Sequence, residues 1–183
     1  AERVAAAIEA LGRRAHFFNV NAADADRRAE VVAAMERALA ESGPPGRLRV
    51  LLHSLAFGTL KPYVADDPKD VVTAAQMGMT LDVMAHSLVY WAQDVVGGGL
   101  MGPGGRIFAM TSAGGTRALP YYGPVSAAKA SLESHIRQLA VELAPRGITV
   151  NTVCAGAVET DIWRALPDGE RLLEAVRSRT PSG

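Results

Sequence analysis

Residues 106–153 decide the fold of this chain, and they read RIFAMTSAGGTRALPYYGPVSAAKASLESHIRQLAVELAPRGITVNTV. Short apolar runs at 106–110 and 148–153 are typical of strands that are buried on both faces of a sheet. Residues 122–143 between them predict a helix, which Pro145, Arg146 and Gly147 end. A strand, a helix and a second strand in this order predict two parallel strands joined by a crossover helix.

The same alternation extends toward both ends of the chain. A further strand is predicted at 48–53, another at 16–20, and helices are predicted near 4–11, 31–39, 71–96 and 161–179. Helix and strand therefore alternate at intervals of roughly 30 residues, the pattern of an α/β doubly wound parallel sheet of the Rossmann type. In the strand order 3-2-1-4-5-6 of such sheets, 16–20 would be the third strand and 48–53 the fourth.

Composition and charge exclude several classes of partner. Acidic and basic residues cancel at 19 each, so no electrostatic attraction to nucleic acid or to an anionic membrane is expected. The sequence has no apolar run of the roughly 18 residues that a membrane span needs. The single cysteine, Cys154, permits no internal disulfide, which favours a cytoplasmic location. His16, His86 and His135 have no metal-ligand spacing with one another or with Cys154, so we expect no metal site.

Three residues near the middle of the chain carry the candidate chemistry. Tyr122 and Lys129 lie seven residues apart on one predicted helix, which brings them within roughly 20° of the same face and about 10 Å apart along its axis. Both can therefore reach one ligand that lies along the helix. Ser112 follows the preceding strand at its carboxyl end, where ligands bind in such sheets. A phenol beside an ammonium can donate a proton or a hydrogen bond to a substrate oxygen that gains charge.

These residues stand in stretches that resemble the short-chain dehydrogenase/reductase superfamily. The stretches are 111–114 (TSAG), 122–131 (YGPVSAAKAS) and 147–160 (GITVNTVCAGAVET). The common Tyr-x3-Lys pattern would put the tyrosine at Val125, whereas Tyr-x6-Lys with Tyr122 is similar to the pattern of bacterial enoyl-acyl-carrier-protein reductases. Residues 53–57 (HSLAF) and 81–88 (LDVMAHSL) resemble the same group.

The resemblance implies a role for each matching residue. Tyr122 would stabilise the enolate oxygen, Lys129 would hold the nicotinamide ribose, and Ser112 would occupy the position of the superfamily's catalytic serine. Many enoyl reductases have a second tyrosine at that serine position. The implied cofactor is NADH or NADPH, and its implied binding positions are Asn19, Val20, Ser54, Leu55, Lys129, Gly156, Val158 and Thr160. His53, within the same strand exit, is expected to pack or to bond to backbone.

The resemblance also implies that the sheet is incomplete at both ends. Residues 1–183 would form one NAD(P)-binding Rossmann-fold domain that lacks the N-terminal glycine-rich strand-turn-helix and the C-terminal closing strand. The strand at 48–53 would then expose an apolar edge.

The function that the resemblance implies is NAD(P)H-dependent reduction of the C2=C3 double bond of an enoyl thioester, carried on acyl-carrier protein or coenzyme A. One alternative is a short-chain ketoreductase or alcohol dehydrogenase, and a second is a non-catalytic fragment. The expected assembly is a homotetramer. Its predicted apolar surface consists of Leu88, Trp91, Leu132, Ile136 and Leu139.

Overall fold

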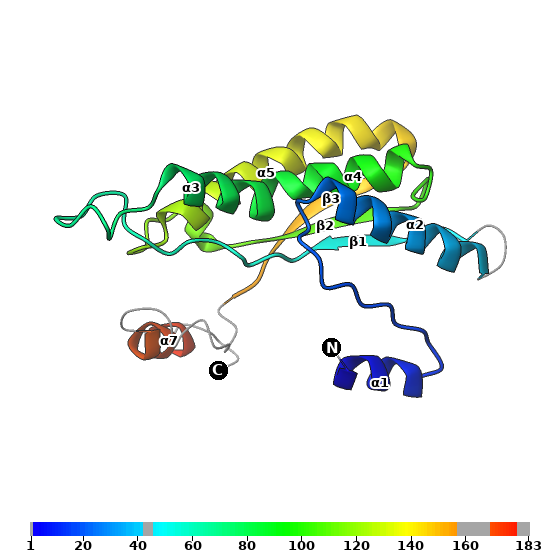
Figure 1. Ribbon diagram of the computed structural model, residues 1–183, viewed down its shortest axis with the longest axis horizontal. Helices are drawn as coiled ribbons and strands as arrows, with labels where there is room; N and C mark the ends of the chain where they lie inside the picture. Colours follow the sequence, from blue (N-terminus) through cyan, green and yellow to red (C-terminus); the bar gives the residue numbers. More distant parts are fainter. Residues whose placement is uncertain (1, 42–45, 157–168, 179–183) are drawn as a thin grey trace.

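A three-stranded parallel sheet forms the centre of the computed structural model, which describes residues 2–41, 46–156 and 169–178 (Figure 1). Strands β1 (Val50–His53), β2 (Arg106–Thr111) and β3 (Thr149–Cys154) lie in the order β1-β2-β3. In the register, His53 lies opposite Ala109, and Thr111 lies opposite Cys154. The carboxyl ends of all three strands therefore meet at one edge of the sheet, as the sequence predicted.

Helices cover one face of this sheet (Figure 1). These are α2 (Ala25–Glu41), α3 (Ala74–Leu81), the π-helical turn η1 (Asp82–His86), α4 (Ser87–Gly97) and α5 (Gly123–Leu143). Two short 3-10 turns, η2 (Ala113–Gly115) and η3 (Ala144–Arg146), flank α5, and α1 (Glu2–Ala10) and α7 (Gly169–Arg177) lie near the two ends of the described chain. The predicted α/β doubly wound class is confirmed for this part of the sheet.

The core lies between the sheet and helices α4 and α5. Leu88 of α4, Ile107 of β2 and Leu132 of α5 are fully buried. Burial of large apolar side chains stabilises the fold by roughly 1.5–3 kcal/mol each relative to exposure. This core holds α5 against β2, so Lys129 and Tyr122, the residue that precedes the helix, are fixed relative to the strand ends.

Local signals in the sequence set where the helices begin. The Thr73 hydroxyl accepts from the backbone N–H of Gln76, and the Gln76 side chain accepts from the N–H of Thr73. This capping box starts α3 at Ala74, three residues after the predicted helix start at 71. Pro124 lies in the first turn of α5, where its missing N–H costs no helical hydrogen bond.

The predicted strand at residues 16–20 is wrong. Residues 13–21 have no regular secondary structure, and the Phe17 and Phe18 side chains are exposed. A strand is held by hydrogen bonds to a neighbour, and none of the three described strands lies beside these residues. An apolar run alone could not show whether such a neighbour exists.

The apolar surface predicted for a tetramer is also wrong. Leu88, Leu132, Ile136 and Leu139 all belong to the core cluster of the chain itself. The half-buried Trp91 donates its indole N–H to the Ala22 carbonyl at 3.1 Å. The assembly therefore stays a prediction that these residues no longer support.

The face of the sheet opposite α2–α5 carries exposed apolar side chains. Val50 and Leu52 of β1 are 51% and 56% exposed, and Val153 of β3 is 39% exposed. These side chains lie on a face of the sheet, so the apolar edge expected at 48–53 stays a prediction. Among the described helices, none is long and apolar enough to cross a membrane.

Candidate active site

Ser112 and Tyr122 meet where β2 ends and α5 begins. The Tyr122 hydroxyl donates to Ser112 Oγ at 3.4 Å, and the backbone N–H of Gly114 donates to the same oxygen at 3.1 Å. Gly114 lies against the Tyr122 ring so closely that a Cβ at this position would overlap the ring. Glycine at 114 therefore lets the phenol approach Ser112, and the predicted pair is brought together.

Lys129 reaches the same edge of the sheet from the next turns of α5. Its side chain is 6% exposed, and Nζ donates to the Met110 carbonyl at 2.7 Å and to the Leu55 carbonyl at 3.5 Å. Burial lowers the pKa of Lys129 from its usual value. An ammonium has three N–H donors, so beside these two carbonyls one donor is left for a ligand. Lys129 is thus fixed between the ends of β1 and β2.

A strained backbone lies immediately before the candidate phenol. Tyr121 has φ of 61°, in the left-handed region, and Tyr122 follows with φ −90° and ψ 0°. The left-handed conformation costs a bulky residue roughly 1–2 kcal/mol. The next residue, Gly123, lies against the Tyr63 ring. A Cβ at position 123 would stand 2.6 Å from Tyr63 Cζ. Strain of this kind occurs at sites where the surrounding structure fixes a functional side chain.

The tyrosine position of the common Tyr-x3-Lys pattern is filled by a core residue. Val125 is 5% exposed, and its Cγ2 would stand 2.9 Å from a Cβ at Gly58. A ring at 125 has no room beside Gly58. A tyrosine at position 125 is therefore disfavoured, whereas Tyr122, the tyrosine of the Tyr-x6-Lys spacing, lies beside Ser112.

The predicted cofactor positions are only partly brought together. Ser54 and Leu55 follow β1, and the Leu55 carbonyl accepts from Lys129. Gly156 follows β3 and is exposed. Val158 and Thr160 lie outside the described residues.

Asn19 and Val20 belong to the irregular segment that leads to α2. The described hydrogen bonds do not join either residue to Ser112, Tyr122 or Lys129. Just after this segment, Arg28 donates to Asp94 of α4 at 2.8 Å and to the Ala23 carbonyl at 2.7 Å. These contacts fix the segment on α4, so the adenine-binding role of Asn19 and Val20 stays a prediction.

One buried polar contact beside the site was not anticipated from the sequence. His53 ends β1 and is 4% exposed, and its Nε2 lies 2.8 Å from Ser87 Oγ. The sequence assigned His53 to packing or to a backbone bond, and the structure buries the ring and adds a side-chain partner. A second unexpected pair joins η1 to α5, where His86 Nδ1 lies 2.9 Å from His135 Nε2.

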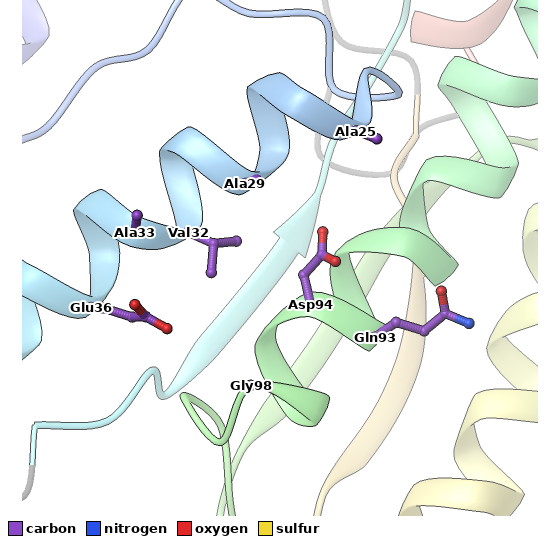
Figure 2. A pocket seen from close by; sticks show the side chains of 8 residues that line it. All are labelled: Ala25, Ala29, Val32, Ala33, Glu36, Gln93, Asp94 and Gly98. Atoms are coloured by element: carbon purple, nitrogen blue, oxygen red, sulfur yellow. The ribbon is translucent and has the colours of Figure 1, made fainter.

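A groove of about 460 Å³ lies between α2 and α4, and Figure 2 shows the side chains that line it. Its lining residues are Ala25, Ala29, Val32, Ala33, Glu36, Gln93, Asp94 and Gly98. None of them is a candidate catalytic or cofactor residue, so the chemistry described above depends on the strand ends and not on the groove. In the described ranges, no group of three or more His, Cys, Asp or Glu side chains could hold a metal ion.

A model of the family described as enoyl-(acyl carrier protein) reductase matches residues 1–183. The chain belongs to this family. The resemblance to short-chain dehydrogenases/reductases is likewise confirmed, since the chain superposes with a TM-score of 0.73 and 31% identity on a short-chain dehydrogenase of Burkholderia cenocepacia in complex with NADP. That match covers 98% of this chain and 67% of the other.

Two further proteins of the family match much of this chain. The NADH-dependent enoyl-[acyl-carrier-protein] reductase FabI of Enterococcus faecalis is 34% identical over 142 residues, which are 74% of this chain and 53% of that protein. The enoyl-acyl carrier protein reductase of Bacillus cereus, solved with NADP⁺ and an indole naphthyridinone, gives a TM-score of 0.79 at 26% identity. That match covers 97% of this chain and 66% of the other.

A relative with a coenzyme A substrate in its name is also similar. The 1-cyclohexenylcarbonyl-CoA reductase of Streptomyces collinus is 32% identical over 142 residues, 74% of this chain and 48% of that protein. The chain thus spans about half the length of the curated relatives it matches.

Proposed function

We propose that this protein reduces the C2=C3 double bond of an enoyl thioester, carried on acyl-carrier protein or coenzyme A, with NADH or NADPH. The observation that supports this most is the position of one phenol and one ammonium at the same edge of the sheet. Tyr122 bonds to Ser112 after β2, Lys129 bonds to the Met110 carbonyl of β2, and the core residue Val125 occupies the alternative tyrosine position. The proposal treats residues 1–183 as one NAD(P)-binding domain.

The residues at the strand ends fit a nicotinamide cofactor. Lys129 has a donor left beside its two carbonyl partners, and a ribose hydroxyl is an acceptor of the right kind. Ser54 and Leu55 lie at the end of β1, where the crevice of a doubly wound sheet binds its ligand. When bound, the cofactor would supply the hydride for the substrate β-carbon.

Tyr122 then acts on the thioester oxygen. Its hydrogen bond to Ser112 is long at 3.4 Å and therefore weak. The phenol can replace this bond with one to a substrate oxygen at little cost in hydrogen-bond energy. Donation from the phenol stabilises the negative charge that develops on that oxygen. Ser112 Oγ accepts from Gly114 and from Tyr122, so its own proton is available as a second donor to the same oxygen.

The Ser112–Tyr122 pair also supports the second candidate, a ketoreductase. Both hydroxyls could bond to a ketone oxygen as well as to a thioester oxygen. Hydride reaches C3 in both reactions, and the negative charge develops on the C3 ketone oxygen in one and on the thioester oxygen in the other. Following the nicotinamide absorbance with a crotonyl thioester and with an acetoacetyl thioester separates these functions. Faster oxidation with the acetoacetyl thioester would favour the ketoreductase, and no oxidation with either would favour a chain that only binds.

Tyr122→Phe is the direct test of the phenol. We expect turnover to fall about 100-fold or more, because a positioned acid contributes 10²–10⁴-fold. Tyr121→Phe is a matched control, since it removes the neighbouring phenol hydroxyl and keeps the same ring. Equal turnover in the parent and Tyr122→Phe on both thioesters would contradict the assignment of Tyr122.

A further inference from the structure

His53 is a buried polar residue that the proposed reaction does not use directly. It ends β1 on the side that faces the helices and is 4% exposed. Its Nε2 contacts Ser87, the first residue of α4, at 2.8 Å. Ser54 and Leu55 follow it in the chain, and the Leu55 carbonyl accepts from Lys129. His53 therefore stands between the helix layer and the segment that contacts Lys129.

The hydrogen bonds define a single tautomer for His53. Ser87 Oγ lies 2.7 Å from the Val83 carbonyl and donates to it, which uses the only proton of that hydroxyl. Ser87 must then accept from His53, so the proton of the neutral imidazole is on Nε2. His53 Nδ1 is buried without a hydrogen-bond partner in the described structure. Burial and, second, the Lys129 charge lower the pKa of His53 to about 4, so the ring is neutral at neutral pH.

We propose that His53 is a positioning residue for the candidate cofactor site. The His53 side chain holds the Ser54–Leu55 strand exit so that the Leu55 carbonyl stays within reach of Lys129. This inference rests on the proposed function. The Lys129 bond to Leu55, at 3.5 Å, is longer than its bond to Met110, at 2.7 Å. A small displacement of the strand exit would therefore break the Leu55 bond first.

Packing alone does not explain this side chain. Burying an imidazole nitrogen without a partner is unfavourable, and an aliphatic side chain such as that of Ile107 fills the same face of the neighbouring strand without that penalty. A cationic side chain here would repel Lys129. A neutral ring that donates from one nitrogen fixes the direction of the strand exit, as an aliphatic side chain cannot, and adds no charge beside the ammonium.

Two substitutions in the full chain separate a positioning role of His53 from a packing role. His53→Gln places an uncharged amide donor near the position of Nε2, and His53→Leu fills similar space without a donor. Titrating NADH and NADPH by fluorescence, we expect about tenfold weaker affinity for His53→Leu, as for the loss of one buried hydrogen bond. We expect His53→Gln to stay within about twofold of the parent.

A purely structural role gives a different result. It would lower the melting temperature and the active fraction of His53→Leu, while the KM for cofactor stayed at the parent value. Unchanged cofactor affinity in folded His53→Leu would overturn the proposal, as would equal loss in His53→Gln. If His53→Leu does not fold, Ser87→Ala removes the same hydrogen bond, and cofactor affinity at the parent value would again overturn the proposal.

A measurement without cofactor keeps the inference distinct from the proposed function. If the parent binds neither nicotinamide, the proposed function fails, and ¹⁵N NMR of the Lys129 ammonium then decides the positioning role. We expect its protons to be protected from exchange in the parent and in His53→Gln, and to exchange at least about tenfold faster in His53→Leu. Equal exchange in all three proteins would overturn the inference.

Discussion

Acid should destabilise this fold through His53. In the folded chain burial, with a smaller contribution from the Lys129 charge, lowers the pKa of His53 from 6.5 to about 4. Between these two pH values the unfolded chain binds more protons than the folded chain, so stability falls as the pH falls. The contribution is fully present above pH 6.5 and is lost as the pH approaches 4.

The two pKa values give the magnitude of the effect. The interval from 6.5 to about 4 corresponds to about 3 kcal/mol of unfolding free energy, of which about 2 kcal/mol is lost by about pH 5. His53→Gln cannot titrate and should lack this loss. Between about pH 7 and about pH 5, its unfolding free energy should therefore fall by about 2 kcal/mol less than that of the parent.

Urea unfolding followed by circular dichroism measures this difference. His135→Gln is the control, because burial and the neighbouring His86 also lower the pKa of His135. Its ring is only partly buried, so we expect a change of the same sign and smaller size. Parallel pH curves for the parent and His53→Gln would refute the reasoning, since His53 would then titrate alike in the folded and unfolded states.

Four other substitutions test the site and the packing around it. Lys129→Met should weaken cofactor binding at least about tenfold, which fluorescence titration measures. It should not lower the melting temperature, because it removes a desolvated ammonium, and melting curves check this. Gly58→Ala should destabilise the fold by about 1–3 kcal/mol in urea unfolding, because its Cβ would stand 2.7–2.9 Å from three side-chain atoms. Gly78→Ala is its control: with nothing within 4 Å inside α3, it should stabilise by about 0.5–1 kcal/mol. Val125→Tyr should not restore turnover to Tyr122→Phe, because residue 125 lies in the core; recovery in the thioester assay would count against this.

The sequence predicted which side chains come together near the start of α5. Spacing of seven residues predicted that Tyr122 and Lys129 share one face of a helix. In the structure both side chains reach the end of β2, Tyr122 through Ser112 and Lys129 through the Met110 carbonyl. Helical periodicity and strand polarity are local properties, so they could be derived from residues alone.

Properties that depend on distant neighbours could not be derived in this way. The apolar run at 16–20 has the composition of a strand, but strand formation requires a partner that the run does not specify. Leu88 and Leu132 have helical spacing, which marks an apolar face without showing whether it packs inside the chain or between chains. The structure places both residues in the chain's own core.

The π-helical turn η1 is the feature that a periodic pattern was least able to predict. In an α-helix the N–H of Ser87 would bond to the carbonyl of Val83, four residues earlier. Here it bonds to Asp82, five residues earlier, and the Ser87 hydroxyl donates to Val83 instead. Because the hydroxyl proton is donated to Val83, Ser87 Oγ can only accept from His53. This acceptance fixes the tautomer of the buried ring. The wider turn thus leaves the Val83 carbonyl to the Ser87 hydroxyl, and the hydroxyl accepts from the His53 ring beside Lys129.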